Sequence, residues 1–321
     1  MPGSRGTSDG AALDRAQRDE LLRLVTLRVR GDGTTTTTIP FLSLVRSARP
    51  TAMRRGLLEP SLSLVLQGER RTRFGGETRR CGAGAYVVSA LEYPAAGEIV
   101  RASEARPYLA IRVVFDVHEM AEVIGDGIGG VDGVRGVDGA AVVARAEPAT
   151  PAVFVGVASA RLVACVLRGV QLLDEPDGGV YLAGAVRREI IYRLLRTAGG
   201  PLIQRSGKPA NAGIGRVLDW LRRHVDQPLD IAALARACRM SVSSLHHEFK
   251  AATALAPLQF QKQLRLQAAR RLLVAGDVDA GTAARRVGYE SASQFSREYR
   301  RMFGAPPRRD IRALAGLPAE L

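Results

Sequence analysis

Two stretches near the end of the chain decide its fold: MSVSSLHHEFKAATALAPLQFQKQLRLQAARRLL at 240–273 and RVGYESASQFSREYRRMFGAPPRRD at 286–310. Each contains a segment with the apolar spacing of a helix, directly after a serine and a short turn. Another short helical segment precedes each turn, so one design occurs twice, about 50 residues apart. Helix, tight turn, helix is the pattern of a helix-turn-helix unit. We therefore predict two such units, over about 231–251 and 280–303.

The starts of the predicted helices carry residues that cap helices. Asp230 and Ser241 stand directly before the two helices of the first unit. Asp279 and Ser291 stand at the matching places in the second unit, and Gln294 follows Ser291 by three residues. Asp and Ser side chains accept hydrogen bonds from the free N–H groups of the first turn, and a Ser-x-x-Gln sequence predicts a capping box.

The second helix of each unit has one apolar and one polar stripe. The apolar stripes are Val242, Leu245 and Phe249, and then Phe295, Tyr299 and Met302. The polar stripes are Ser243, His246, His247 and Lys250, and then Ser293, Ser296, Arg297 and Arg300. Such a helix buries one side and offers donors to base edges and phosphates from the other. Any solvated helix can show this spacing, so the prediction depends on the repetition and on the segment between the copies.

A single helix is predicted to join the two units. It starts at Pro257, a residue favoured in the first turn, and ends before Gly276. Residues 257–273 would form a helix about 25 Å long, at about 1.5 Å per residue. With the packing width of each unit added, this length approaches the ~34 Å between successive major grooves on one face of DNA. One rigid helix would thus hold two recognition helices one turn of DNA apart.

The charge of the chain favours a nucleic acid as its first partner to test. The 321 residues include 46 Lys and Arg against 32 Asp and Glu, which gives a net charge of +14. Nearly all of the cations are arginines, whose planar group suits two-point recognition of phosphate. From residue 211 on, 18 basic residues face 10 acidic ones, so the charge is densest in the helical region.

Other counts exclude whole classes of protein. Cys81, Cys165 and Cys238 are too few and too scattered for a disulfide framework or a zinc site. His118 is the only histidine before residue 224, whereas a metal-dependent barrel enzyme needs several His and carboxylate ligands. The start MPGSRGTSDG lacks the apolar core of a signal peptide, and the longest apolar stretch, 152–160, is too short to span a bilayer. We expect a cytoplasmic protein without membrane association, catalytic residues, metal or cofactor.

Before the helical region, apolar residues recur at every second position, which is the spacing of β-strands. Apolar residues alternate over 62–66 and 109–115, and glycines stand where turns between short strands would fall. Many short antiparallel strands predict a small barrel. The threonine run 34–38 fits an entry strand or a flexible arm, and we predict the arm. After residue 148 the period predicts two helices joined as a hairpin, over 155–173 and 182–195.

At the two C-terminal stretches the sequence resembles the AraC/XylS family of bacterial transcription regulators. EPSLSLVLQGERR at 59–71 and RPYLAIRVVFD at 106–116 resemble one N-terminal subfamily. QLLDEPDGG at 171–179 and VRREIIYRLL at 186–195 extend the resemblance, which covers about 38–310. It implies an α+β multidomain protein: a cupin-like β-barrel with a helical hairpin, then an all-α domain of seven helices with two helix-turn-helix units.

Composition and resemblance together give the expected domains. These are 1–37 for a flexible N-terminal arm, 38–196 for a cupin-like sensing and dimerisation domain with its hairpin, 197–212 for a linker rich in Gly and Pro, 213–314 for the DNA-binding domain and 315–321 for a C-terminal tail.

By motif position, the resemblance assigns contacts with bases and phosphates to seven residues. They are Ser243, His246 and His247 in the first unit, and Ala292, Ser293, Ser296 and Arg297 in the second. Neighbouring polar residues complete the expected DNA-binding set: Ser241, Ser244, Lys250, Ser291, Arg300 and Arg301. Two residues depart from the family pattern. Arg239 occupies a turn position where the family usually has glycine, and Ala292 can offer only a methyl group to thymine.

Some residues of the barrel region allow two interpretations. Cys81 follows Arg79 and Arg80, and neighbouring cations can lower a thiol pKa, so it is a candidate sensing residue as well as a small residue at a strand end. Tyr86, Tyr93 and Tyr108 would line a pocket or fill the core. Glu92 is expected to be a solvated loop carboxylate rather than a ligand-binding group.

The sequence predicts a sequence-specific transcription regulator that binds double-stranded DNA in two successive major grooves. A small-molecule effector in the barrel, a homodimer and a contact with RNA polymerase are its further expected partners. Two alternatives stay open: a cupin-type enzyme with an appended DNA-binding domain, and a barrel that serves only for dimerisation. The effector, the operator and the choice between activation and repression are not determined.

Overall fold

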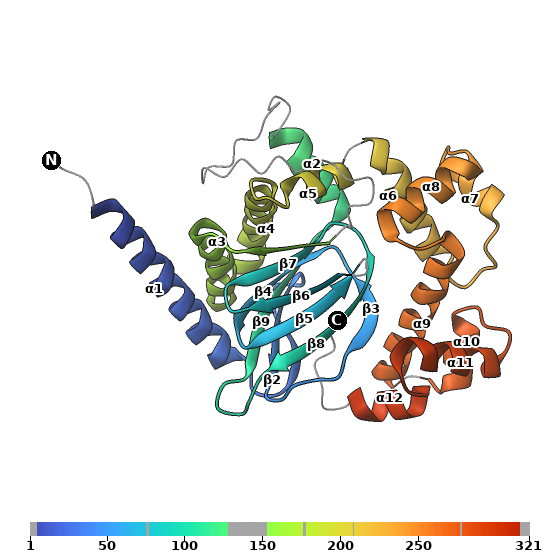
Figure 1. The fold of residues 1–321 in the computed structure, drawn as a ribbon, viewed down its shortest axis with the longest axis horizontal. Coiled ribbons are helices and arrows are strands. Elements are labelled where there is room, and N and C mark those ends of the chain that lie inside the picture. The colour runs from blue at the N-terminus through green and yellow to red at the C-terminus, as the bar shows by residue number, and fades with distance from the viewer. Residues whose placement is uncertain are drawn as a thin grey trace.

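The computed structural model describes residues 5–74, 77–127, 153–175, 178–207, 209–276 and 278–314. Two parts follow each other along the chain, a β-rich part with its own helices and a helical part (Figure 1). The predicted α+β multidomain fold is therefore confirmed.

Ten described strands build two antiparallel sheets. The six-stranded sheet has the order β1-β2-β9-β4-β7-β10 and the four-stranded sheet the order β3-β8-β5-β6. The strands are β1 Gly33–Thr36, β2 Leu42–Ser47, β3 Arg54–Leu58, β4 Ser61–Gln67, β5 Glu69–Phe74, β6 Glu77–Gly82, β7 Ala85–Ser89, β8 Tyr93–Arg101, β9 Tyr108–Val114 and β10 Val153–Val157. The two alternating runs seen in the sequence are the paired strands β4 and β9.

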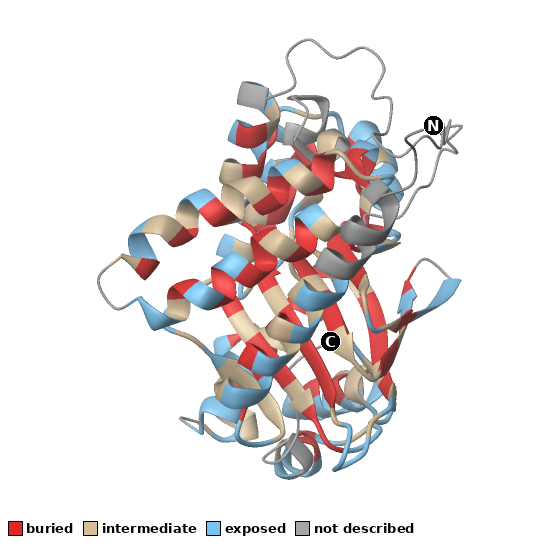
Figure 2. Cartoon of the chain, turned by 90° about the vertical axis from the view of Figure 1, so that its left-hand side faces the viewer, coloured by how far each residue is buried: buried red, intermediate tan, exposed pale blue. Residues whose placement is uncertain are grey.

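Alternation along these strands separates two apolar layers. Leu62 and Leu64 belong to a core that the large sheet shares with helices, whereas Val65 belongs to the core inside the barrel. Because successive side chains of a strand point to opposite faces, one strand can serve both cores. Helices α1, α3 and α4 cover the large sheet, and each turns a buried stripe toward it (Figure 2).

The N-terminal region is structured where the sequence predicted a flexible arm over 1–37. Over the described residues 5–37, helix α1 Arg5–Arg28 packs on α3, and strand β1 pairs with β2. Leu21 and Val25 of α1 are fully buried. The arm prediction is wrong because the tertiary structure supplies an apolar face for α1 and an open strand edge for the threonines, whose β-branched side chains suit a strand.

The hairpin also begins differently from the prediction. Residues from Val153 to Val157 form strand β10 at the edge of the large sheet, and the first hairpin helix, α3 Ala160–Gln171, starts only after them. A short 3-10 turn, Leu172–Asp174, leads to α4 Gly179–Leu195, and α2 Val117–Gly127 lies against α4. Valines at alternate positions fit an edge strand as well as a helix, so pattern alone did not decide.

The predicted linker over 197–212 is helical in its described part. Helix α5 Gly200–Gly207 packs on α2 and α4, and α6 Pro209–Arg223 then starts the C-terminal domain. Leu202 and Ile203 are buried. Helices form here although the sequence has no helical period, because burial of these two side chains outweighs the weak helix propensity of glycine, which costs about 1 kcal/mol per residue relative to alanine.

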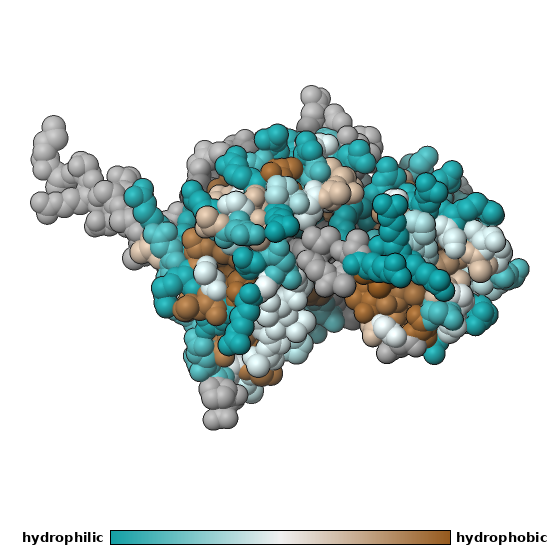
Figure 3. Space-filling model, turned by 90° about the horizontal axis from the view of Figure 1, so that it is seen from below, coloured by the Kyte–Doolittle hydropathy of each residue, from teal (hydrophilic) through white to brown (hydrophobic). Residues whose placement is uncertain are grey.

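The C-terminal helices form two compact groups around a shared long helix. They are α6, α7 Ile231–Ala237, α8 Val242–Thr253, α9 Pro257–Ala275, α10 Ala280–Arg286, α11 Ala292–Phe303 and α12 Pro307–Leu314. One apolar cluster joins α6 to α9 with the barrel interior, and a separate one joins α9 to α12. Seen from below, hydrophilic residues cover most of the outer surface of this part, and apolar residues gather toward the barrel (Figure 3).

Candidate nucleic-acid interface

The caps predicted from the sequence are present in both units. The Asp230 carboxylate accepts from the N–H groups of Ala232 and Ala233 at 2.8 and 3.0 Å, and these bonds lower its pKa. The Asp279 carboxylate accepts from Thr282 N–H at 2.7 Å. Ser241 Oγ accepts from Ser244 N–H at 3.0 Å. These bonds fix where α7, α10 and the recognition helix α8 begin.

The capping box predicted for the second unit is only half formed. Ser291 Oγ accepts from Gln294 N–H at 3.2 Å, but the Gln294 amide donates to Glu298 at 3.3 Å instead of turning back to the helix start. Glu298 competes for the amide because it lies one turn ahead on the same face of the helix.

The predicted DNA-contacting residues share one property, exposure to solvent. All of them are exposed: Ser241, Ser243, Ser244, His246, His247, Lys250, Ser291, Ala292, Ser293, Ser296, Arg297, Arg300 and Arg301. On the opposite face, Leu245 and Phe249 of α8 and Phe295 and Tyr299 of α11 are buried. Within the described part of the chain, neither Arg297 nor Arg300 forms an ion pair. Both helices therefore present free donors away from their cores.

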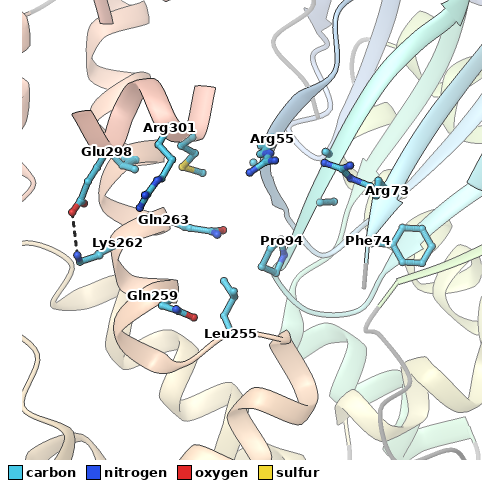
Figure 4. Close-up of a pocket in the computed structure, with 15 residues that line it drawn as sticks. Arg55, Arg73, Phe74, Pro94, Leu255, Gln259, Lys262, Gln263, Glu298 and Arg301 are labelled. Atoms are coloured by element: carbon cyan, nitrogen blue, oxygen red, sulfur yellow. Dashed lines mark hydrogen bonds and ion pairs between the residues drawn. The ribbon is translucent and has the colours of Figure 1, made fainter. Parts of the chain in front are cut away.

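Three predicted contact residues have another local role. The side chains of Ser241 and Ser291 cap helices, and the Ser241 hydroxyl also donates to Ser244 Oγ at 2.9 Å. Arg301 lines a cleft that faces the barrel, because it stands on the flank of α11 rather than on the polar stripe (Figure 4). The polar spacing in the sequence did not distinguish these positions from the outer stripe.

The connecting helix α9 binds both units through residues that the sequence analysis missed. Arg265 donates to the carbonyls of Val225 and Gln227, in the segment between α6 and α7 that leads into the first unit, at 2.6 and 2.7 Å. It also donates to the carbonyl of Gly288 in the second unit, at 2.9 Å. The Gln261 amide adds a bond to the Gln227 carbonyl at 2.9 Å. In the sequence these are ordinary polar residues on a helix, and no signal there marks them.

The turn of the second unit fits directly against the segment between α6 and α7 that leads into the first unit. Gly288 has φ +81°, and a Cβ built on it would lie 2.1 Å from the carbonyl oxygen of Asp226. Both the left-handed backbone and the close approach require glycine here. Together with Arg265, this contact fixes the orientation of the units relative to each other.

The matching turn of the first unit is strained, as its departure from the family pattern predicted. Arg239 has φ +56°, a left-handed conformation that costs a side-chain-bearing residue roughly 1–2 kcal/mol. We expect Arg239→Gly to raise the free energy of unfolding in urea by about 1 kcal/mol. Arg239→Ala is the control, because it removes the guanidinium but keeps the strain, and it should leave the stability unchanged. Equal stabilisation by both variants would mean that the side chain, not the backbone, is unfavourable.

An ion-pair cluster stabilises the core of the second unit. Arg270 binds both oxygens of Asp310 at 2.8 and 3.0 Å, and the Tyr299 hydroxyl donates to the same carboxylate at 2.8 Å. Burial, and the hydrogen bond to Asp310, raise the pKa of Tyr299. Arg270 and Tyr299 thus provide hydrogen-bond partners for both oxygens of this buried carboxylate.

A cleft of about 730 Å³ lies between the barrel and the second unit (Figure 4). Barrel strands β3, β5 and β8 form one wall, and helices α9 and α11 form the other. Its lining is apolar at Phe74, Pro94, Ala95, Ala96, Leu255, Leu266 and Met302. Arg55 and Arg73 of the barrel and Arg301 of α11 supply positive charge, and none of them forms an ion pair with a described residue.

The structure argues against Cys81 as a sensing thiol. Its side chain is fully buried, and burial raises the pKa of the thiol to about 11. The neighbouring cations expected to lower this pKa bind carboxylates instead: Arg79 pairs with Glu77 at 2.6 Å and Arg80 with Glu69 at 3.2 Å. A protonated, buried thiol is a poor nucleophile.

The other residues singled out in the barrel have structural positions. Tyr86, Tyr93 and Tyr108 are buried in the cores. Glu92 is not the solvated carboxylate that was expected, because it pairs with Arg222 of the C-terminal domain at 3.1 Å. Burial raises the pKa of Glu92, and Arg222 opposes this effect. His118 stands in α2, and its side chain lies outside the described residues.

The residues that the structure describes contain no group of three or more His, Cys, Asp or Glu residues arranged to hold a metal ion. Among the described helices, none is both long and apolar enough to cross a membrane.

Comparison with known proteins identifies relatives for both parts of the chain. Residues 234–313 match the helix-turn-helix domain family. A probable thc operon regulatory protein of Rhodococcus erythropolis is 37% identical over 111 residues, 33% of this chain and 33% of that protein. The transcriptional activator RhaS of Escherichia coli is 29% identical over 144 residues, 44% of this chain and 51% of RhaS. The matches thus span only about a third and a half of these relatives.

A solved structure shares the whole architecture. ToxT from Vibrio cholerae, solved with an unsaturated fatty acid bound, aligns with a TM-score of 0.61 at 10% identity, over 87% of this chain and 96% of ToxT. The N-terminal family, described as AraC-type transcriptional regulator N-terminus, matches residues 38–202, just over half of the chain. This protein belongs to the AraC-type family of transcriptional regulators.

Proposed function

We propose that the protein is a sequence-specific DNA-binding transcription regulator whose helices α8 and α11 enter successive major grooves. The observation that carries this proposal is the pair of exposed polar faces, fixed to one rigid helix by Arg265 and Gly288. Exposed arginines without ion pairs to described residues support it, because they remain available for phosphates. Selection of bound sequences from a random DNA pool tests it, and failure to enrich any sequence would contradict it.

The two recognition helices are expected to contribute differently to binding. His247 on α8 can reach base edges, and a good bidentate pair adds ~1–3 kcal/mol of discrimination. Arg300 on α11 is expected to contact phosphate. Each such contact adds about −0.9 to the slope of the logarithm of the binding constant against the logarithm of the salt concentration. We therefore expect His247→Ala to relax base preference in one half-site, and Arg300→Ala to weaken all sequences alike while flattening the slope by about one unit.

Binding to a panel of single-base variants of the selected DNA, at two or more salt concentrations, measures both effects. A change in base preference with Arg300→Ala, and none with His247→Ala, would reverse the assignment of the two helices.

We further propose that the cleft between the domains binds an effector, an amphiphile with an anionic head. Its volume of about 730 Å³ lies in the usual range of ligand sites. Apolar side chains fit a hydrocarbon body, and three guanidiniums without ion pairs to described residues fit a carboxylate. ToxT, which shares the fold, has been solved with a fatty acid, and this supports the class of ligand. The sequence predicted an effector inside the barrel. The cleft instead lies at the barrel surface, so the effector would bind there.

Decanoate and the uncharged decanol distinguish this site from nonspecific apolar binding. We expect decanoate to bind the full chain and Arg73→Met to weaken its binding about tenfold, the loss of one charge-assisted hydrogen bond worth about 1.4 kcal/mol. Decanol binding should be equal in both proteins. Isothermal titration measures each affinity. Equal decanoate affinity in the wild type and the variant would exclude Arg73 as a ligand for the head group.

The remaining partners and the location are part of the same proposal. A regulator of this family is expected to act in the cytoplasm, to contact RNA polymerase and to pair with a second copy of itself. The barrel is proposed as a binding domain rather than a catalyst, since the relatives named above are transcription regulators.

A further inference from the structure

The first residue of helix α8 departs from the apolar stripe in which the sequence placed it. Leu245 and Phe249 of this stripe are fully buried, whereas Val242 is 45% exposed. Helices α8 and α11 are described throughout, and Val242 is the one large apolar side chain in them that is exposed. Val242 therefore adds little to the core of the first unit, and its methyl groups are accessible to a partner.

The second recognition helix begins in the same way. Residues 241–250 and 291–300 repeat one order of exposed, half-buried and buried positions, residue by residue. In that register Val242 corresponds to Ala292, which is also exposed. Both stand directly after the serine that caps the helix. The two helices thus share an apolar first residue beside a row of polar side chains.

The local structure holds Val242 in a fixed position. Ser241 Oγ accepts from Ser244 N–H at 3.0 Å, and the Ser241 hydroxyl donates to Ser244 Oγ at 2.9 Å, so the first turn of the helix is closed. Valine is branched at Cβ, and in a helix this branching leaves one strongly preferred rotamer. Because backbone and rotamer are both restricted, the methyl groups of Val242 lose little conformational freedom when they contact a partner.

The start of each recognition helix is also suited electrostatically to lie against DNA. Neither α8 nor α11 has an acidic residue in its first turn. An acidic residue there would stabilise the helix through its dipole but would repel the phosphates. In helix-turn-helix proteins the N-terminal residues of the recognition helix contact base edges. Val242 stands at such a position, but its side chain can neither donate nor accept a hydrogen bond.

We propose that Val242 contacts the 5-methyl group of one thymine in the half-site bound by the first unit. This methyl group is an apolar feature that thymine presents in the major groove, and apolar side chains recognise it by contact. His246 is exposed one helical turn further along the same side, so it can donate to a neighbouring base edge. The contact presupposes the DNA binding proposed above and adds one specificity-determining residue to it.

Replacing the thymines of the selected DNA one at a time by uracil tests this contact, because uracil lacks the methyl group and keeps every hydrogen-bonding atom. At one thymine we expect the wild type to lose about fourfold in affinity, the effect of burying about one methyl group. In Val242→Ala the same replacement should change the affinity by less than about twofold, because the shorter side chain loses most of the contact. Titration of labelled DNA measures all four affinities.

Leu258→Ala is the matched control. Leu258 is a similarly exposed apolar residue, at 51%, but it stands at the start of α9, outside both recognition helices. This variant should keep the full response to uracil. A selected site without a uracil-sensitive thymine, or a full response in Val242→Ala, would overturn the contact and leave the DNA binding in place. Failure to select any DNA sequence would instead contradict the proposed function itself.

Discussion

Arg265→Ala is expected to uncouple the two helix-turn-helix units. The guanidinium joins the carbonyls of Val225 and Gln227, in the segment that leads into the first unit, to the carbonyl of Gly288 in the second unit. Without it, the second unit is held in place less rigidly. Once the first unit is bound, the effective concentration of the second unit at its own half-site is then lower, and the gain from binding both half-sites falls. On DNA with both half-sites we expect at least about a tenfold loss of affinity, and on DNA with one half-site a change within about twofold.

Spacing selectivity gives a second measurement on the same variant. Inserting base pairs between the half-sites should weaken the wild type strongly, because a rigid connection tolerates one distance only. The variant should be less sensitive to the insertion.

The matched control is Arg271→Ala, which removes one positive charge from the same helix. Arg271 is exposed, and its ion pair with Glu59 is long, at 3.6 Å. It should lose little affinity and keep the spacing preference. If both variants lost affinity equally on every DNA, Arg265 would act only through its charge.

Gly288→Ala is expected to have the largest effect on stability. The added Cβ would lie 2.1 Å from the Asp226 carbonyl oxygen. Because this oxygen belongs to the backbone, no side-chain rotation relieves the overlap. The left-handed φ of +81° adds strain of its own. We expect a loss of about 3 kcal/mol or more in the free energy of unfolding, measured in urea.

Gly304→Ala is the matched control for this prediction. Gly304 ends α11 with φ +84°, and a Cβ there would meet nothing within 4 Å. The first unit already has Ala254, with φ +60°, at the corresponding helix end. We therefore expect Gly304→Ala to cost only about 1 kcal/mol. Equal losses in the two variants would show that backbone conformation, and not the contact between the units, makes Gly288 necessary.

Local sequence determined the helical half of this protein. Asp230, Ser241, Asp279 and Ser291 start helices through bonds within their own turn, and Pro257 does so through its fixed φ. Such effects need only a few consecutive residues. For that reason α7 and α10 begin at the predicted residues, and α11 has the predicted bounds. The left-handed turn at Arg239 was likewise foreseen from one position.

Tertiary structure decided where distant segments meet. Helix α1, strand β10 and helix α5 carry weak or ambiguous periodicity, and each forms because a neighbouring sheet or helix covers its apolar side. Cys81 shows that sequence neighbours alone do not predict the reactivity of a side chain. Its neighbours in the sequence are cations, but its neighbours in space exclude water, and this burial raises the pKa of the thiol.

The functional contacts that the sequence did not reveal are all long-range. Arg265 binds carbonyls 23 to 40 residues away, and the cleft brings Arg73 of the barrel near Arg301 of α11. A polar or charged residue looks the same in a sequence whether it contacts solvent or a distant backbone, because its partner is chosen by the fold. The sequence by itself therefore determined two capped, polar-faced recognition helices on one connecting helix, through interactions a few residues apart. Only the packing of segments far apart in the chain decided how rigidly those helices are held and where a ligand can bind.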